Sequence, residues 1–277
     1  ARTIALGAQV DVMTTASGTL DLNGGSGDLM MAENATLNTV DGDIRITAGD
    51  DVLDQVVIGD IFAANADVSI EAAGSVLDTV DTDNEVEALT LRIVAGKGVG
   101  LLAGNSLGSA VNSFETAVDI LSIHVDGSDG VNILEDDALR IGNTAAITVQ
   151  SVVSDSTSFE QVEATQSDVV TTNTNGSNGS IVLRSEAGPL TLTEGTAEDD
   201  INPDASVVAH GSGNILLAAE GADTDVIAQA NADIETTTGH ITLTAARTIT
   251  LGAQVDVTTT ASGTLDLNGG SGDLMMA

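Results

Sequence analysis

The sequence has no cysteine, tryptophan or tyrosine, and only two prolines, three phenylalanines and seven lysines plus arginines in 277 residues. The lack of cysteine excludes disulfide bonds and thiolate metal ligands. Against those few basic residues stand 42 aspartates and glutamates, which give a formal net charge of −35. Proteins bind nucleic acids and anionic lipids through lysine and arginine, so we expect no nucleic-acid partner.

Long apolar runs are also absent. No segment approaches the roughly eighteen apolar residues of a membrane span, so we expect no membrane insertion. The chain starts at Ala1 without a methionine or an apolar signal segment, and we therefore expect it to be part of a longer protein. The 42% hydrophobic content is nevertheless too high for an acidic disordered tail. The chain is expected to fold around small aliphatic side chains.

The most informative feature is a duplication. Residues 246–277 repeat residues 1–32 with thirty identities in thirty-two positions, the exceptions being Ala5 against Thr250 and Met13 against Thr258. A fold does not require exposed side chains to match so closely, so the repeat indicates a tandem duplication with a shift of 245 residues. We expect residues 1–245 to be one repeat unit of about nine coils, and residues 246–277 to begin the next copy.

A shorter period lies inside the long one. A five-residue motif recurs, in which large aliphatic residues occupy the first and third positions and a small residue occupies the fifth. It occurs as "LDLNG" at Leu20, "IRITA" at Ile44, "VSIEA" at Val68, "LRIVA" at Leu91, "IHVDG" at Ile123, "ITVQS" at Ile147, "IVLRS" at Ile181, "ILLAA" at Ile215, "ITLTA" at Ile241 and "LDLNG" at Leu265. The spacings are 24, 24, 23, 32, 24, 34, 34, 26 and 24 residues, which sum to 245. The short and long periods therefore agree.

The alternation within each motif predicts a strand with one buried face. Turns containing Gly, Asp or Ser follow, and then further short apolar pairs. Three short strands in coils of 24 to 34 residues predict an all-β fold, a parallel β-helix or β-solenoid. The general preference of parallel crossovers predicts that it is right-handed.

The runs "GHITLTAARTITLGAQVDVTTTASGTLDLNGG" and "NADVSIEAAGSVLDTV" resemble the coils of filamentous-haemagglutinin-type and autotransporter-like proteins and the tandem arrays of very large bacterial adhesin-like surface proteins. The resemblance covers nearly the whole chain. It implies a secreted bacterial protein, located outside the cell or on its surface, that acts as a stalk, adhesin or filament. It carries over no catalytic motif, and the secretion domain, cap and anchor of a complete member do not occur in this sequence.

Acidic clusters are candidate calcium ligands, because calcium binds six to eight oxygen atoms. Asp81, Asp83 and Glu85 have the alternation that begins an EF-hand loop, but Val86 and Arg92 occupy the places of its glycine and its closing glutamate. Asp50 and Asp51 form a second candidate. The alternative is that all of these residues lie in solvated turns. Apart from calcium we expect no cofactor.

An enzyme is the less favoured interpretation. Some polysaccharide lyases and hydrolases share the β-helix fold, but they need a positioned base or two carboxylates at a set separation. The basic residues here are predicted to lie on separate coils, and sugar sites favour aromatic platforms that this sequence lacks. We assign no catalytic residue. The outward positions between the paired aliphatics are predicted to stack Arg45 on Asp21. The whole predicted column is Asp21, Arg45, Ser69, Arg92, His124, Thr148, Val182, Leu216, Thr242 and Asp266.

Three apolar residues depart from the outward-polar pattern: Val182, Leu216 and Ala218. Either an inserted segment folds over them, or they form a lateral contact between filaments. The partners we expect are further copies of the chain, in tandem or head to tail, with bundling as a possibility. The sequence thus predicts a structural segment of a surface filament. A module that binds a cell or glycan surface through turns and inserted loops is the alternative.

Overall fold

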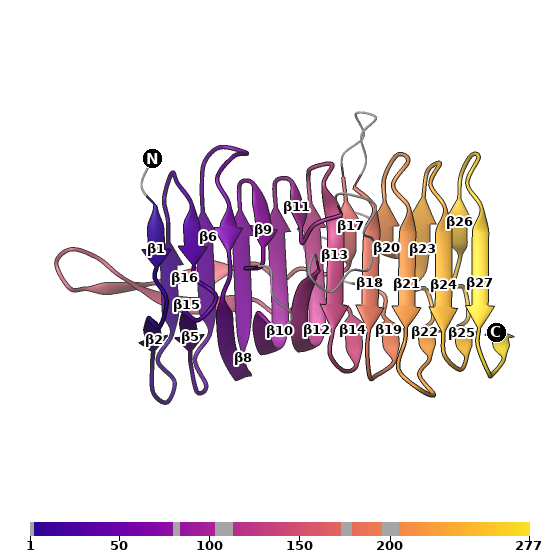
Figure 1. The fold of residues 1–277 in the computed structure, drawn as a ribbon, viewed down its shortest axis with the longest axis horizontal. Helices are drawn as coiled ribbons and strands as arrows, with labels where there is room; N and C mark the ends of the chain where they lie inside the picture. Colours follow the sequence, from indigo (N-terminus) through magenta and orange to yellow (C-terminus); the bar gives the residue numbers. More distant parts are fainter. Residues whose placement is uncertain (1–2, 80–83, 103–112, 173–178, 196–204) are drawn as a thin grey trace.

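The computed structural model describes residues 3–79, 84–102, 113–172, 179–195 and 205–277. Within these ranges the secondary structure consists of β-strands, and there is no helix. Twenty-six strands form one large sheet with parallel pairings, and the other two form an antiparallel hairpin. The sheet winds into an elongated rod with the N-terminus near one end and the C-terminus at the other (Figure 1). The predicted all-β solenoid is thus confirmed.

The strands pair in three series that run along the rod. Series A contains β1 (Ile4–Leu6), β4 (Leu29–Met31), β7 (Val56–Val57), β9 (Ser75–Leu77), β11 (Gly98–Val99), β13 (Gly130–Glu135), β18 (Ile181–Ser185), β21 (Ile215–Ala219), β24 (Ile241–Ala245) and β27 (Leu265–Gly269). Each strand pairs with its neighbours in this order, so series A forms one continuous face.

Series B begins with β2 (Asp11–Met13) and β5 (Thr36–Asn38) and continues through the first halves of β8 (Asp60–Ala72) and β10 (Val86–Ala95) to the middle of β12 (Phe114–Val125). The first residues of β12, 114–116, also pair with β13 of series A. Series B then contains β14 (Leu139–Ile141), β19 (Leu190–Leu192), β22 (Val226–Ala228), β25 (Ile249–Leu251) and β28 (Leu274–Met276). The long strands β8, β10 and β12 therefore turn from one face of the rod onto the next without a break.

Series C contains β3 (Leu20–Asn23), β6 (Ile44–Ala48), the second halves of β8, β10 and β12, and then β17 (Val169–Thr171), β20 (Ala205–Ala209), β23 (Asp233–Thr236) and β26 (Val257–Thr259). The hairpin consists of β15 (Ile147–Val152) and β16 (Ser158–Glu163), which leave the rod between β14 and β17.

The core lies inside the rod and consists of columns of aliphatic residues. In β6, Ile44 and Ile46 are fully buried while Arg45 and Thr47 point outward and are half-buried. The parallel register aligns Ile46 with Leu22 on one side and with Ile70 on the other. Burying one such side chain contributes about 1.5–3 kcal/mol, so the alternation found in the sequence places the main stabilising energy inside the rod.

The predicted column of outward residues is only partly right. Asp21, Arg45, Ser69 and Arg92 do lie in register in series C. The next member is Ser122 and not His124, because Arg92 aligns with Ser122. The motif at Ile147 was predicted as a coil strand but belongs to the hairpin.

The second half of the predicted column lies on another face. The residues Val182, Leu216, Thr242 and Asp266 are in register in series A. The periodicity was correct for each half, but it cannot reveal which of three equivalent faces a strand occupies.

As a consequence, the two copies of the duplicated segment do not occupy the same faces. Leu20 lies in series C, whereas its counterpart Leu265 lies in series A. Ile4 lies in series A, and its counterpart Ile249 lies in series B. Eight pairing steps separate β1 from β24, and β25 is the next strand along the chain. One period is therefore eight coils plus one strand, slightly fewer than the nine coils expected.

Candidate functional site: a hairpin strap and a buried carboxylate cluster

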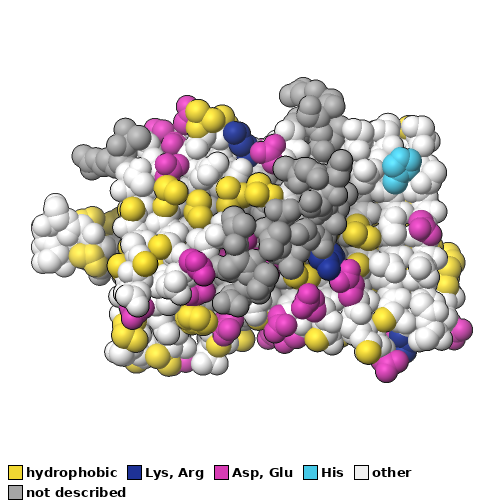
Figure 2. Space-filling view, in the orientation of Figure 1, with side chains coloured by type: hydrophobic (Ala, Val, Ile, Leu, Met, Phe, Trp, Pro, Cys, Tyr) yellow, Lys and Arg dark blue, Asp and Glu magenta, His cyan; other side chains and the backbone are white. Residues whose placement is uncertain are grey.

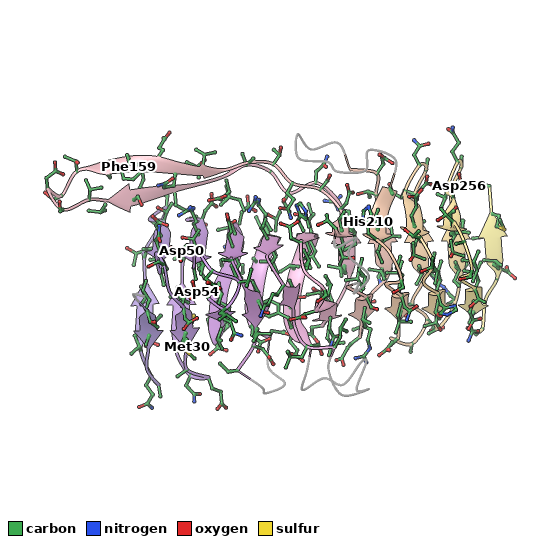
Figure 3. All side chains as sticks on the ribbon, turned by 90° about the horizontal axis from the view of Figure 1, so that it is seen from above. Met30, Asp50, Asp54, Phe159, His210 and Asp256 are labelled. Carbon is green, nitrogen blue, oxygen red and sulfur yellow. The ribbon has the colours of Figure 1, made fainter. Side chains whose placement is uncertain are left out.

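The hairpin, called the strap below (residues 147–163), lies along the outside of the rod. Its two strands pair antiparallel from Ile147 opposite Glu163 to Val152 opposite Ser158. It runs back over series C toward the N-terminal end of the rod and reaches past the first strands (Figure 1, Figure 3). The strap therefore crosses β3, β6 and β8, which lie 75 or more residues before it in the chain.

A buried polar network fixes the base of the strap. The Thr144 and Gln166 backbones exchange two hydrogen bonds, with N–O distances of 2.8 and 3.2 Å. The Gln166 side-chain amide donates to the Ile93 carbonyl at 3.1 Å and to the Ser122 hydroxyl at 3.2 Å. These bonds attach the base to β10 and β12, so the direction of the strap is set where it leaves the rod.

Side chains at odd-numbered positions of the strap face the rod. Ile147 and Val149 are fully buried there. The Ser151 hydroxyl donates to the Asp21 carboxylate. Along the edge, the Gln150 backbone N–H donates to the Thr19 hydroxyl at 2.9 Å. Opposed residues of an antiparallel pair share a face, so the rod-facing side of the strap mixes apolar and polar residues: Ile147 lies beside Glu163, Val149 beside Gln161 and Ser151 beside Phe159.

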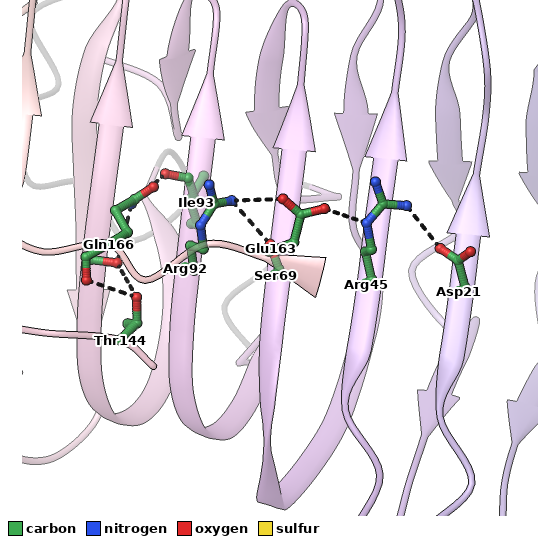
Figure 4. Close-up of polar contacts among 9 residues, drawn as sticks. Asp21, Arg45, Ser69, Arg92, Ile93, Thr144, Glu163 and Gln166 are labelled. Carbon is green, nitrogen blue, oxygen red and sulfur yellow. Dashed lines mark hydrogen bonds and ion pairs between the residues drawn. The ribbon is translucent and has the colours of Figure 1, made fainter. Parts of the chain in front are cut away.

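An ionic chain links the strap to three coils (Figure 4). The Glu163 carboxylate accepts a hydrogen bond from Arg45 Nε and lies 3.7 Å from Arg92 Nη1. Arg45 Nη1 also lies 3.1 Å from the Asp21 carboxylate. Burial opposes the charge of Arg45, but the hydrogen bonds to Glu163 and Asp21 outweigh it and raise its pKa. The predicted contact between Arg45 and Asp21 is confirmed, but it lies beneath the strap and not on an open surface.

Removing the Glu163 carboxylate is expected to loosen the strap. In Glu163→Ala, Arg45 and Arg92 lose a shared counter-ion in a largely buried place, so we expect a loss of about 2 kcal/mol in the free energy of unfolding. Amide hydrogen exchange in β15 and β16 should accelerate more than exchange in the rod. Glu160→Ala is the matched control, because Glu160 is on the outward side of the same strand and is exposed. Equal exchange rates in the two variants would contradict the role of Glu163.

A second site is a cluster of three buried carboxyl groups. Asp78 follows β9, Glu85 precedes β10 and Glu115 lies in β12, and they are 4%, 2% and 2% exposed. One oxygen from each lies within 4.8 Å of the others. Glu85 accepts a hydrogen bond from the Glu115 backbone N–H at 2.9 Å, and Glu115 accepts one from the Ser113 hydroxyl at 3.0 Å.

Three adjacent buried carboxyl groups cannot all be ionised without compensation. Burial raises the pKa of Glu85, and the neighbouring Glu115 carboxyl raises it further. Burial also raises the pKa of Glu115, against the hydrogen bonds that it accepts from Glu85 and Ser113. The cluster therefore either holds protons at neutral pH or offers three carboxylate oxygens to a cation such as calcium, which needs six to eight oxygens in total.

The calcium candidates from the sequence meet the cluster at one residue. Glu85 belongs to it, and Asp81 and Asp83 lie outside the described residues. Asp50 and Asp51 are exposed in a turn where Asp54 accepts hydrogen bonds from both of their backbone N–H groups, at 3.2 and 3.1 Å. Among the residues described, neither belongs to a group of three clustered ligands. Calcium binding thus stays a prediction.

Asp78 lies in the acidic run "DTVDTDNEVE" that also contains Glu85, so the sequence pointed to these two residues together. Glu115 was missed at the sequence level. It lies 30 residues after Glu85 and joins the cluster only through the stacking of coils, so nothing in the sequence distinguishes it from the many exposed acidic residues.

The predicted lateral contact residues are mostly covered. Val182 is 2% exposed and Ala218 is 1% exposed, while Leu216 is half-buried. A contact between filaments would thus reach Leu216 alone of the three, and bundling stays a prediction. On the face seen in Figure 2, acidic side chains are spread over both halves of the rod and do not gather in one patch.

Comparison with known proteins finds no match to a family model, to a curated protein or to a solved structure. None of the described residues belongs to a helix with the length and apolar character of a membrane span.

Proposed function

We propose that the chain is a structural segment of a long extracellular or cell-surface β-solenoid filament or stalk, in which copies stack end to end. In this proposal the solenoid is a right-handed β-helix with three short strands in each coil of 24 to 34 residues. The resemblance to adhesin-like surface proteins supports the same role.

The duplicated segment carries the proposal. Its second copy stacks directly on the preceding coil: β25 pairs parallel with β22, and β27 pairs parallel with β24. These are the same type of pairing as that between β1 and β4 in the first copy. A new period therefore begins inside the sheet without a cap or linker, and a further period can be added in the same way.

Burial differs between the two copies in the manner that stacking requires. Leu20 is 8% exposed, but its counterpart Leu265 is 47% exposed. Leu29 is fully buried, but its counterpart Leu274 is 47% exposed. In the first copy the following coil covers these side chains and pairs their backbones. Leu265 and Leu274 are thus the side chains that a further stacked coil would bury, as the following coil buries Leu20 and Leu29.

The strap supports a load-bearing role. In a solenoid, each coil is held mainly by its two neighbours. The strap contacts β3, β6 and β8, and its base is bonded to β10 and β12. It thus ties five successive coils together on one face, which resists separation of neighbouring coils.

A two-period chain tests the proposal. Residues 1–277 followed by residues 33–277 should form one straight rod, longer by one period of eight coils and one strand. At a strand spacing of ~4.8 Å, the added length is about 40 Å, measurable by electron microscopy or X-ray scattering. Two particles joined by a flexible connection would contradict the proposal and favour a discrete binding module. In its native source, the protein should have a denaturing mass that contains several periods.

A further inference from the structure

The tip of the strap reaches beyond the strands that hold it. Ser151 bonds to Asp21 on β3, and β3 is the first strand of series C. Residues 152–158 continue past this point, so no series C strand of this chain lies beneath them. Figure 3 shows the strap leaving the N-terminal end of the rod, with Phe159 near the place where it leaves.

Two apolar side chains face the rod side here: Val153 within the overhang and Phe159 where it begins. Phe159 is opposite Ser151 in the hairpin and shares its face, so the ring points toward the rod side. Yet Phe159 is 46% exposed, and Val153, which has the same parity, is 42% exposed. At the base, Ile147 and Val149 have this orientation and are fully buried. Val153 in the overhang and Phe159 at its start therefore have the same rod-facing orientation as Ile147 and Val149, but no coil of this chain covers them.

The duplicated segment shows which coil would lie there. Thr264 and Asp266 are the second copies of Thr19 and Asp21, which hold the strap in the first copy. Asp266 lies in β27, which belongs to series A, and Thr264 directly precedes this strand. The strands that precede β27 on this face are β24 and β21.

The outward residues on the two series A strands that precede Asp266 fit the rod-facing side of the overhang. Thr242 and then Leu216 are in register with Asp266, and Leu216 is a partly exposed apolar side chain. Val153 is two residues beyond Ser151, or ~6.6 Å along an extended strand, whereas neighbouring coils are ~4.8 Å apart. In the second copy, Val153 would therefore lie between the first and the second strand that precede the anchoring strand β27, which are β24 and β21.

We propose that the strap of each copy crosses the joint and packs Val153 and Phe159 on β24 and β21 of the preceding copy, near Thr242 and Leu216. This inference rests on the proposed function, because its occupant is a second copy of the chain stacked in tandem. Each period contains eight coils plus one strand, so the second copy is turned by one face. The strap of the second copy therefore packs on series A, although the strap of the first copy lies on series C. Straps in an array thus advance by one face from copy to copy.

The two-period chain tests this directly. The sequence has no cysteine, so pairs of cysteines can be introduced and spin-labelled. One label replaces Ser158 of the second strap, on its outward side, and the other replaces Thr244 of β24 in series A or Glu235 of β23 in series C. We expect a short, narrow distance to position 244, similar to that from Ser158 of the first strap to Asn23, and a longer distance to position 235.

A shorter distance to position 235 than to position 244 would overturn the inference, and so would a broad distribution at both. If the two-period chain forms one rod but gives either result, the strap does not pack on the preceding copy, while the proposed function stands. If the chain forms two separate particles, the proposed function itself fails.

Substitutions test the packing of the overhang. Phe159→Ser in the second strap should broaden the distance to position 244, whereas Val162→Ser should not, because Val162 is 57% exposed on the outward side. Phe159→Ser in the first strap should leave the distance from its Ser158 to Asn23 unchanged, because no coil precedes it. Equal broadening by Phe159→Ser in both straps would show that the ring stabilises only the hairpin.

Discussion

At pH 7, Glu135→Gln is expected to raise the free energy of unfolding by about 3 kcal/mol. Glu135 is the last residue of β13 and is fully buried. Burial raises the pKa of its carboxyl group to about 9, against hydrogen bonds from the Thr116 hydroxyl and the Val118 backbone N–H, and nearby Asp137 raises it further. Folding at neutral pH therefore requires this group to take up a proton.

The pH dependence follows from this proton. An unfolded glutamate has a pKa of about 4.3, so between about pH 4.3 and the folded value of about 9 the folded state binds more protons than the unfolded state. Stability due to Glu135 is then fully present below the unfolded pKa and is lost as the pH rises, by about 1.4 kcal/mol per unit. Glutamine keeps the shape, accepts from Val118 and donates to Thr116, without a proton to take up.

Denaturant unfolding at pH 4, 5.5, 7 and 8 measures the effect. We expect wild type to lose stability from acid to neutral pH, and Glu135→Gln to lose less, with no gain over wild type at pH 4. Glu33→Gln is the matched control, since it removes one negative charge from an exposed side chain and should keep the wild-type slope. If Glu135→Gln destabilises the protein at pH 7, the Glu135 carboxylate is ionised in the fold and held by its two donors.

The fold was predictable from the sequence because its determinants are local and repeated. Alternation at Leu20, Ile44 and Val68 predicts strands with one buried face, and spacings of about one coil predict parallel stacking. The register of these residues in the structure is the predicted one. Each coil repeats the same pattern of short strands with one buried face, so a wrong assignment of one segment does not change the predicted architecture.

The strap was not predicted, and the reason is its composition. The segment at Ile147 alternates like a coil strand, since Ile147 and Val149 are buried against the rod's outer face and not in its core. The signal that could have identified it is the polar turn "SDST" between two short runs that contain β-branched and aromatic residues, Val152 and Val153 before it and Phe159 and Val162 after it, which is typical of a hairpin. Ser156 in this turn has a φ of 66°, a conformation common in tight turns.

The candidate sites depend on stacking and were therefore beyond the sequence. Glu163 meets Arg45 across 118 residues, and Glu85 meets Glu115 across 30. No local pattern encodes these separations in the sequence, because they depend on the number of residues in each coil. The displacement of the second copy by one face arises from the same cause.

The second large effect is expected at a glycine where coils come closest. In Gly239→Ala, the new methyl group would overlap the carbonyl oxygen of Gly213 in the coil below. A backbone carbonyl cannot move aside without disturbing the pairing of β21 with β24. Overpacking of this kind costs about 3 kcal/mol or more, so we expect a large fall in melting temperature. Gly263 stands over the Gly239 carbonyl in the same way, so the glycines form a column at this corner.

Gly18→Ala is the matched control, because Gly18 is the first-copy counterpart of Gly263 in an identical turn. The three atoms nearest to a methyl group at Gly18 all belong to the Thr14 side chain, the closest at 2.9 Å, and none is a carbonyl of a neighbouring coil. We expect a cost of about 1 kcal/mol or less there. If Gly18→Ala is as damaging as Gly239→Ala, the turn needs glycine for its own conformation and not for stacking. If the two differ as expected, the cost comes from the coil below, and Gly263, which stands over the Gly239 carbonyl in a turn with the sequence of the Gly18 turn, should not tolerate alanine either.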